Sequence, residues 1–514
     1  MTLLRPLLTA LCATILFIAP PAHADTTAED AAAVQAQLHD WLTNLVAPML
    51  PADAQPVTVS PDGDGFLLRV NSPASANAVI PQGSAVTLKA TRLEGGRWAL
   101  DGLTLPSPLI ITIPARSIAH AHHPDSPDNQ PNTITINTEK ATYQGIFDPS
   151  FTTASHFESH SEGTSSSSPA SESEAGSTTS SMDMEPLGEG RMLLRTHTST
   201  NALHQRFMQV NGTPGELAWS HSETKAKAES FSPGTLADLI RALSPLLADH
   251  SGARLSPEQH DVWNRAVADL FSISGPISSE SDISDITLRV VGGVISAGSV
   301  HVGTRFETRK AAPYLTLHLA LHDLQIPTLP RGGTADLLPH DLTFGLHLGG
   351  IPEADIRQFL LSLSDDVGAA DAAGRQQQQL ALLGQNGFDV GIDTLAFSLD
   401  TTAISGHALA HISGQQQMAM SGDFAAEHLD ALLTRASQDP RLMQSLPILT
   451  IARGLGKQDG TTTRWHIEAK NNAILVNGFD IRAFVPRSAA QRPQPAAPAS
   501  PIAPAPTPKP PARP

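Results

Sequence analysis

Histidine is the residue type with the most chemical potential in this chain, which contains 21 of them. His120, His122 and His123 stand together, shortly before Asp125 and Asp128. Imidazole and carboxylate groups at such spacing can bind a divalent metal ion, so these three histidines are the candidate metal ligands. The surrounding segment is polar and rich in proline, however, and a specific site would have to overcome the entropy of ordering it. We therefore expect neither a specific metal site nor a cofactor there.

Two further pairs of histidines lie within strand-like patterns. His318 and His322 are four residues apart, and so are His407 and His411. Four residues along a strand span about 13 Å, which is too far for both imidazoles to chelate one ion. We expect these histidines to lie on a solvent-facing side of a sheet.

The acidic pairs and the glycine motifs give no catalytic assignment. Asp282 with Asp285, and Asp365 with Asp366, flank expected turns or strand starts, where solvated caps are expected in place of an acid/base pair. Residues 454–457 (Gly-Leu-Gly-Lys) resemble the end of a phosphate-binding loop, but Ile451 stands where that loop has its first glycine. The sequence also lacks a nucleophile elbow, a dinucleotide-binding fingerprint and a zinc-protease helix motif, so it predicts no catalytic residue.

The N-terminus has the pattern of a secretory signal peptide. Arg5 precedes an apolar run from Leu7 to Ile18, and Ala22-His23-Ala24 offers small residues where a signal peptidase cleaves. We expect cleavage after Ala24 and export, with the periplasm of a two-membrane bacterium as the compartment. The only cysteine, Cys12, lies inside this segment, so the mature chain is expected to have no disulfide, thiolate metal site or cysteine nucleophile.

The charge and hydropathy of the rest of the chain limit its partners. The formal net charge of the full chain is −17 at pH 7, which disfavours nucleic acid and anionic lipid head groups as partners at long range. No later apolar run is long enough for a membrane span, so we do not expect an integral membrane protein after cleavage.

The hydrophobic pattern predicts an α+β protein dominated by antiparallel strands. An amphipathic helix is expected from Asp25 to Pro51, and the period changes to two from Val57 onward. Ser256-Pro257-Glu258-Gln259 is a strong helix start, with serine as the N-cap. Leu315, Leu317, Leu319 and Leu321 alternate with polar or small residues, as in a strand with one buried face.

Two segments have compositions that predict disorder. Residues 152–184 consist mainly of Ser, Thr, Glu, Gly and Ala, and are expected to form a disordered insertion within one domain. Residues 486–514 are rich in proline and alanine, and are expected to form an extended tail.

These features predict two lobes that meet in a helical section. After the signal peptide (1–24), residues 25–230 would form an N-terminal helix and antiparallel β lobe containing the 152–184 insertion. Residues 231–485 would form the helical section and a C-terminal α+β lobe, followed by the tail at 486–514.

The C-terminal half resembles exported bacterial envelope proteins of the YdgA-like and AsmA-like groups. The resemblance covers roughly residues 283–485 and lies in the strand units with glycine turns at Ile404–Gly414 and Met418–Asp423, the helix that carries Leu429, Leu432 and Leu433, and the closing Ala473–Gly478 segment. It implies a role in the cell envelope and carries no catalytic residue over to this chain. The chain differs from those groups in its cleavable signal and its proline-rich tail.

Three hypotheses for function follow. The first is a non-enzymatic envelope protein that binds a hydrophobic ligand or a protein partner, in a groove on the leucine-rich faces. The second is a hydrolase acting on a cell-envelope polymer, which requires converging carboxyl groups, one with a raised pKa. The third is a structural spacer that acts through the proline-rich tail.

Overall fold

The computed structural model of the chain describes most of the segments that the sequence assigns to strands. The predicted signal peptide with Ala24, the candidate ligands His120, His122 and His123, and the tail at 486–514 lie outside the described residues. The described residues are 26–36, 57–71, 85–94, 97–113, 132–148, 153–209, 212–236, 238–239, 256–326, 339–365, 386–399, 401–413, 418–440, 442–470 and 473–481.

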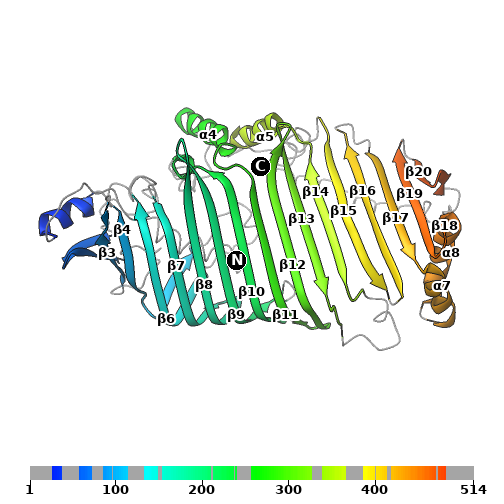
Figure 1. Cartoon of the computed structure of the whole chain (residues 1–514), viewed down its shortest axis with the longest axis horizontal. Coiled ribbons are helices and arrows are strands. Elements are labelled where there is room, and N and C mark those ends of the chain that lie inside the picture. The colour runs from blue at the N-terminus through cyan, green and yellow to red at the C-terminus, as the bar shows by residue number, and fades with distance from the viewer. Residues whose placement is uncertain are drawn as a thin grey trace, which may run out of the picture.

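These residues form one antiparallel sheet of 21 strands that runs the length of the molecule (Figure 1). From β6 to β17 each strand pairs with the next strand along the chain, as in a continuous meander. At the N-terminal end β1 to β4 pair in order, and β4 and β5 both pair with β6. At the other end β17 pairs with β19, which also pairs with β18 and β20.

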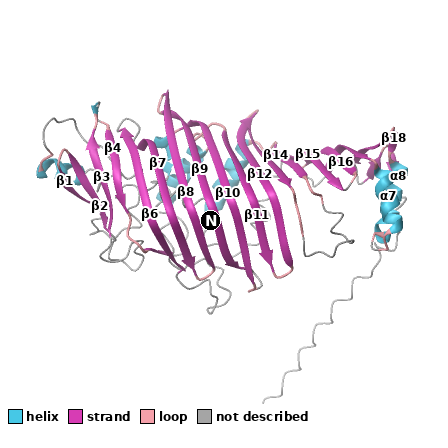
Figure 2. Ribbon diagram, turned by 60° about the horizontal axis from the view of Figure 1, so that its bottom comes forward, coloured by secondary structure: helices cyan, strands magenta, loops and turns pink. Residues whose placement is uncertain are grey.

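The strands are β1 (Val57–Asp62), β2 (Gly65–Asn71), β3 (Ala85–Arg92), β4 (Trp98–Thr104), β5 (Leu109–Ile113), β6 (Asn132–Asp148), β7 (Thr153–Ser168), β8 (Ser171–Gly188), β9 (Arg191–Met208), β10 (Pro214–Phe231), β11 (Ile277–Val290), β12 (Gly293–Arg309), β13 (Ala312–His322), β14 (Leu342–Gly349), β15 (Phe388–Leu399), β16 (Thr402–Ile412), β17 (Met418–Glu427), β18 (Lys457–Asp459), β19 (Thr462–Lys470), β20 (Ala473–Val476) and β21 (Phe479–Asp480). Those from β6 to β12 are far longer than the five or six residues that are usual. The sheet also twists, so that β14 to β16 are foreshortened in a view that shows β6 to β12 at full length (Figure 2).

The helices lie at the margins of the sheet. Helix α4 (Pro257–Leu270) begins with the capping box expected from the sequence: Ser256 accepts from the backbone N–H of Gln259, whose side chain accepts from that of Ser256. It contacts α5 (Glu353–Asp365), where Trp263 Nε1 donates to the carbonyl oxygen of Leu360 at 2.9 Å. Helices α7 (Leu429–Gln438) and α8 (Leu446–Leu455), joined by η6 (Met443–Ser445), stand at the C-terminal end (Figure 1). None of the helices among the described residues is long and apolar enough to cross a membrane.

The largest core lies at the N-terminal end of the sheet. Phe66, Leu68, Trp98 and Phe147 have 0–1% of their surface exposed, and the rings of Phe66 and Trp98 are 5.4 Å apart. Helical residues 28–36 add Ala31 and Val34 to this core. A second, smaller cluster joins Leu429 and Leu432 of α7 to Ala426 of β17.

The prediction of a disordered insertion at 152–184 is wrong. This serine-rich segment forms β7 and β8, two of the longest strands in the middle of the sheet. Strands β6 and β9 flank them, so the backbone groups are paired on both sides. Phe157, Ala175 and Met182 anchor the segment in buried positions. A strand held between two neighbours needs little apolar surface of its own, and low hydrophobicity therefore does not imply disorder here.

The two predicted lobes are not apparent in the sheet. Strand β10, which ends at Phe231, pairs directly with β11, which begins at Ile277. The helical section expected as a boundary is therefore a connection between two neighbouring strands of a continuous sheet. The coarser expectation, a mostly antiparallel β protein with interspersed helices, is confirmed.

A line of irregular residues crosses the central strands at right angles, and we call it the crease. The pairing skips one residue in each of seven strands and resumes beyond it. Alternate members have a positive φ, namely 57° at Gly163, 52° at Ala202, 53° at Asp285 and 55° at Asp323. The crease consists of Glu139, Gly163, Gly176, Ala202, Ser220, Asp285 and Gly298, with Asp323 just after β13.

The inward–outward alternation of side chains changes phase at the crease. In β8 the more exposed residues are Glu172 and Glu174 before Gly176, and Thr179 and Asp183 after it. One residue in each strand is thus left out of the alternation along the same line, while the register of the pairs is the same on both sides of it. As a result one side of the sheet keeps its chemical character across the whole length of the long strands.

Candidate functional site: an uncharged sheet face

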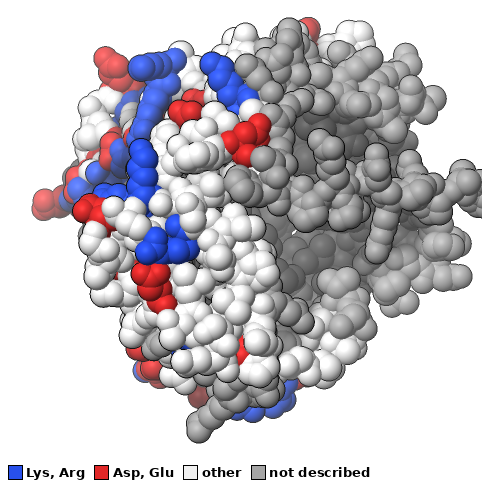
Figure 3. Space-filling view, turned by 90° about the vertical axis from the view of Figure 1, so that its right-hand side faces the viewer, with Lys and Arg blue, Asp and Glu red and all other residues white. Residues whose placement is uncertain are grey.

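The two sides of the sheet differ sharply in charge. Residues that pair across antiparallel strands lie on the same side, so the register assigns each paired residue to a face. We call the side that carries Leu315, Leu317, Leu319 and Leu321 the uncharged face, and the opposite side the charged face. Among the paired residues of the described strands β6 to β17, β19 and β20, the uncharged face carries no Asp, Glu, Lys, Arg or His; Glu139 and Asp285 lie in the crease, outside this pairing. Figure 3 views the molecule from the β19 end, where Lys and Arg side chains lie beside Asp and Glu side chains on the described surface.

An unbroken row of apolar residues crosses the uncharged face, one residue per strand, and we call it the apolar row. Its members pair directly from strand to strand. Neighbouring strands lie about 4.8 Å apart, which makes the row roughly 40 Å long. It consists of Ala228, Ile277, Phe306, Leu315, Leu348, Val390, Ala410, Met420, Ala469 and Ile474.

Five large side chains in this row are substantially exposed: Ile474 on β20 and four that are neighbours. Ile277, Phe306, Leu315 and Leu348 lie on the adjacent strands β11 to β14 and have 42%, 38%, 43% and 39% of their surface exposed. Single exposed apolar residues are common on protein surfaces, but neighbouring ones mark binding sites. This part of the uncharged face is therefore suited to bind a hydrocarbon chain.

The uncharged face of β7 to β10 is lined by hydroxyl groups instead. Two rows of paired residues, which we call the hydroxyl patch, are half-buried there. Thr178 and Thr200 are joined by a hydroxyl hydrogen bond of 3.3 Å, and Ser180 and Thr198 by one of 3.2 Å. Such pairs each stabilise a sheet by about 0.2–1 kcal/mol relative to alanine pairs. The patch consists of Ser159, Ser180, Thr198 and Thr224 in one row and Ser161, Thr178, Thr200 and Ser222 in the other.

The charged face carries a series of histidine–carboxylate pairs that join neighbouring strands. His318, His322, His407 and His411 are exposed, as expected, and His322 and His411 each have their own carboxylate partner. Most of these side chains are exposed, so each pair contributes little to stability. The pairs are His156–Asp183 (2.7 Å), His197–Glu223 (2.9 Å), His204–Glu216, His301–Asp282 (2.8 Å), His322–Asp341 (2.9 Å), His347–Asp393 (2.6 Å), His411–Asp389 (2.8 Å) and His466–Asp423 (2.8 Å).

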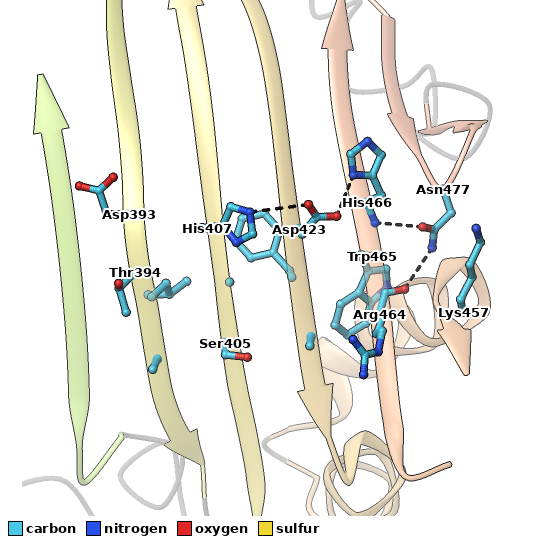
Figure 4. Close-up of a pocket in the computed structure, with 15 residues that line it drawn as sticks. Asp393, Thr394, Ser405, His407, Asp423, Lys457, Arg464, Trp465, His466 and Asn477 are labelled. Atoms are coloured by element: carbon cyan, nitrogen blue, oxygen red, sulfur yellow. Dashed lines mark hydrogen bonds and ion pairs between the residues drawn. The ribbon is translucent and has the colours of Figure 1, made fainter. Parts of the chain in front are cut away.

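A hollow of about 680 Å³ lies along β15 to β19 and is bordered by one such cluster (Figure 4). Asp423 accepts a hydrogen bond from Nδ1 of His466 and lies 3.7 Å from Nε2 of His407. Asn477 accepts from the backbone N–H of His466 at 2.9 Å. The hydrogen bond to Asp423, together with one to Glu468, raises the pKa of His466, so this cluster can hold a proton.

The cluster lacks the other parts of a hydrolytic site. Ser405 lines the same hollow, yet among the described residues no hydroxyl or thiol is hydrogen-bonded to His407 or His466. A nucleophilic mechanism needs that contact. Where a pKa shift of a described carboxyl group is resolved, it is downward; hydrogen bonds lower the pKa values of Glu162, Glu216 and Asp430, for example. The raised carboxyl pKa that the hydrolase hypothesis requires is not found among the described residues.

The remaining residues singled out from the sequence do not converge on one site. Asp282 pairs with His301, whereas Asp285 accepts from Ser220 in the crease. Asp365 ends α5, and Asp366 lies outside the described residues. Gly456 caps the C-terminus of α8 and Lys457 begins β18, which is the reverse of a phosphate loop that precedes a helix. The described residues also contain no group of three metal-ligating side chains.

The hydroxyl patch was missed because half of it, the part on β7 and β8, lies in the segment predicted to be disordered. A signal was present, since residues 157–162 alternate between uncharged (Phe, Ser, Ser) and charged or ionisable (Glu, His, Glu) side chains. This is a period of two in charge and not in hydrophobicity. An analysis of hydrophobic periodicity alone does not detect it.

No protein-family model, curated protein or solved structure matches this chain.

Proposed function

We propose that this protein is an exported envelope protein that binds a hydrophobic ligand along the uncharged face of its sheet. The observation that carries the proposal is the contiguity of Ile277, Phe306, Leu315 and Leu348, which are paired in register and each more than a third exposed. A hydrocarbon chain laid along them would remove apolar surface from water at about 25 cal/mol per Å². The signal-like N-terminus supports export to the periplasm, and the resemblance to YdgA-like and AsmA-like proteins supports the envelope.

The first test is native mass spectrometry of the protein purified from the periplasm, followed by organic extraction. A stoichiometric co-purified lipid is the expected result. A clean mass for the unliganded protein, together with crosslinks from these residues to another envelope protein, would favour a protein partner instead.

A pair of variants on one strand makes the test specific for the face. Leu315→Glu places a charge in the apolar row, whereas Thr316→Glu places it on the charged face of the same strand. We expect Leu315→Glu to weaken binding of a fluorescent fatty alcohol by about tenfold or more, because a charge buried against hydrocarbon is costly. Thr316→Glu should bind as the wild type does. Circular dichroism spectra of both variants establish that the sheet is retained.

A further inference from the structure

The uncharged face changes from hydroxyl groups to hydrocarbon along two of its rows. One row leads from Ser161, Thr178, Thr200 and Ser222 into apolar residues at each following strand. The other leads from Ser159, Ser180, Thr198 and Thr224 through Ser281 into apolar residues. The apolar continuations are Ile283, Val300, Leu321, Leu342, Phe397 and Ile404 in the first row, and Val302, Leu319, Phe344 and Leu395 in the second.

The face therefore has two adjoining chemistries, and none of the paired residues that form it in the described strands is charged. A ligand with a phosphate, carboxylate or ammonium head group would lose part of its hydration without finding a counter-charge, which is strongly unfavourable. A neutral head group that carries hydroxyls exchanges hydrogen bonds with water for hydrogen bonds with serine and threonine at little net cost.

The hydroxyl patch retains the capacity to bind such a head group. A hydroxyl offers one donor and two acceptor sites, so the pair formed by Thr178 and Thr200 still has one proton and spare lone pairs. The adjoining row beyond the crease contains Thr164 and Trp219, whose side-chain Oγ1 and Nε1 are buried without a hydrogen-bond partner in the described part of the chain. Buried polar atoms of this kind usually have a partner, and a water molecule would supply it.

The dimensions agree with an amphiphile that lies across the strands. The exposed residues from Ile277 to Leu348 span three strand spacings, or about 14 Å. That is close to half of the ~30 Å hydrocarbon core of a bilayer, which is the depth one acyl chain occupies. Strands β7 to β10 lie beside β11 to β14 in the sheet, so the head group and the tail would occupy neighbouring strands (Figure 1).

From this juxtaposition we infer that the ligand is a neutral polyhydroxyl amphiphile, such as a glycolipid, with its head group on the hydroxyl patch and its hydrocarbon tail on β11 to β14. This inference rests on the proposed function, because it names the class of hydrophobic ligand for the same face. An anionic phospholipid is the alternative that the charge distribution disfavours.

The test compares three probes that share a twelve-carbon tail and differ in head group. Dodecyl maltoside, dodecyl phosphate and dodecyltrimethylammonium are titrated into the full chain below their micelle concentrations, and binding is measured by calorimetry. We expect the maltoside to bind at least about tenfold more tightly than either charged probe. Equal affinities for all three, or tighter binding of a charged probe, would overturn the inference and leave the proposed function standing. Failure of all three probes to bind would overturn both.

Matched variants locate the head group. Replacing Thr198 and Thr200 together by valine removes two hydroxyls and keeps the shape and strand preference of the side chains. We expect this variant to bind the maltoside roughly tenfold more weakly, while binding of dodecanol is unchanged. Ser199→Ala, on the charged face of the same strand, is the control and should bind both probes as the wild type does. Unchanged maltoside binding by the valine variant, with the sheet intact by circular dichroism, would place the head group elsewhere and overturn the inference.

Discussion

Ser220 donates a hydrogen bond of 2.7 Å from Oγ to Oδ2 of Asp285, within the crease and between the neighbouring strands β10 and β11. Asp285 has a positive φ of 53°, a conformation that aspartate tolerates better than most residues. At the neighbouring positions the crease pairs a glycine with a residue that has a side chain: Gly163 with Glu139, Gly176 with Ala202, and Gly298 with Asp323. The crease keeps the uncharged face continuous, because the inward–outward alternation of side chains shifts at the same level in each of the seven strands β6 to β12.

The first prediction concerns Ala202, the crease member whose conformation suits it least. Its φ of 52° lies in the left-handed region, which costs an L-residue such as alanine about 1–2 kcal/mol relative to glycine. Ala202→Gly should therefore stabilise the protein by about 1 kcal/mol in urea unfolding followed by circular dichroism.

Ala226 on the adjacent strand β10 provides the matched control, because it has no positive φ. Ala226→Gly should destabilise the protein by about 0.5–1 kcal/mol, since glycine weakens a regular strand. Two variants that lower stability equally would show that the crease does not have this geometry.

The second prediction tests the N-terminal core with neighbouring leucines. Leu68 is 1% exposed and packs in the cluster with Phe66 and Trp98, whereas Leu67 points to the opposite side and is 37% exposed. Leu68→Ala should lower the free energy of unfolding by about 2–5 kcal/mol through lost burial and a cavity. Leu67→Ala should change it by about 0.5 kcal/mol or less. Similar losses from the two variants would mean that strand β2 is paired in another register.

The third prediction concerns the serine-rich strands. Amides of β7 and β8 are bonded to neighbours on both sides, so their hydrogen exchange requires opening of the sheet. Peptides from residues 153–188 should exchange as slowly as peptides from β9 and β10 in a hydrogen–deuterium exchange experiment. Complete exchange of 153–188 at the earliest time point, with β9 and β10 still protected, would restore the expectation of a disordered insertion.

Hydrophobic periodicity predicted the strands in which apolar residues alternate with polar ones. It missed β7 and β8, whose residues are almost all polar or small. The alternation of Leu315, Leu317, Leu319 and Leu321 predicted β13, and Ser256 with Gln259 predicted the start of α4, because both signals are local. Strands β7 and β8 are stabilised by β6 and β9, and such long-range pairing leaves no trace in the hydrophobicity of the strand itself.

The candidate site could be predicted only in part, for the same reason. The sequence indicated leucine-rich faces and histidines on the opposite side, but the apolar row depends on the register of ten strands, which fixes that Ile277, Phe306 and Leu315 are neighbours. The crease could not be predicted from the sequence either, because members such as Ala202 and Ser220 are residue types that also occur in regular strands. Its position becomes visible only when the pairing of adjacent strands is known.

The last prediction concerns the protonation of His466. The hydrogen bond to Asp423, and then the one to Glu468, raises the pKa of His466 above its ordinary value of 6.5. Because the folded state binds this proton more tightly than the unfolded state, the resulting stability is fully present below pH 6.5 and is lost as the pH rises through the raised pKa. The difference in unfolding free energy between wild type and His466→Gln should accordingly be largest at mildly acidic pH.

The imidazole signal of His466 in an NMR titration measures this pKa directly. It should titrate above 6.5 in the wild type, and Asp423→Asn should shift it downward, since the largest cause of the raised pKa is removed. Asp282→Asn breaks a similar pair with His301 on β11 and β12 and should leave the titration of His466 unchanged. If His466 titrates at or below 6.5 in the wild type, its side chain does not form the hydrogen bond to Asp423, and the cluster beside the hollow does not hold a proton as described here.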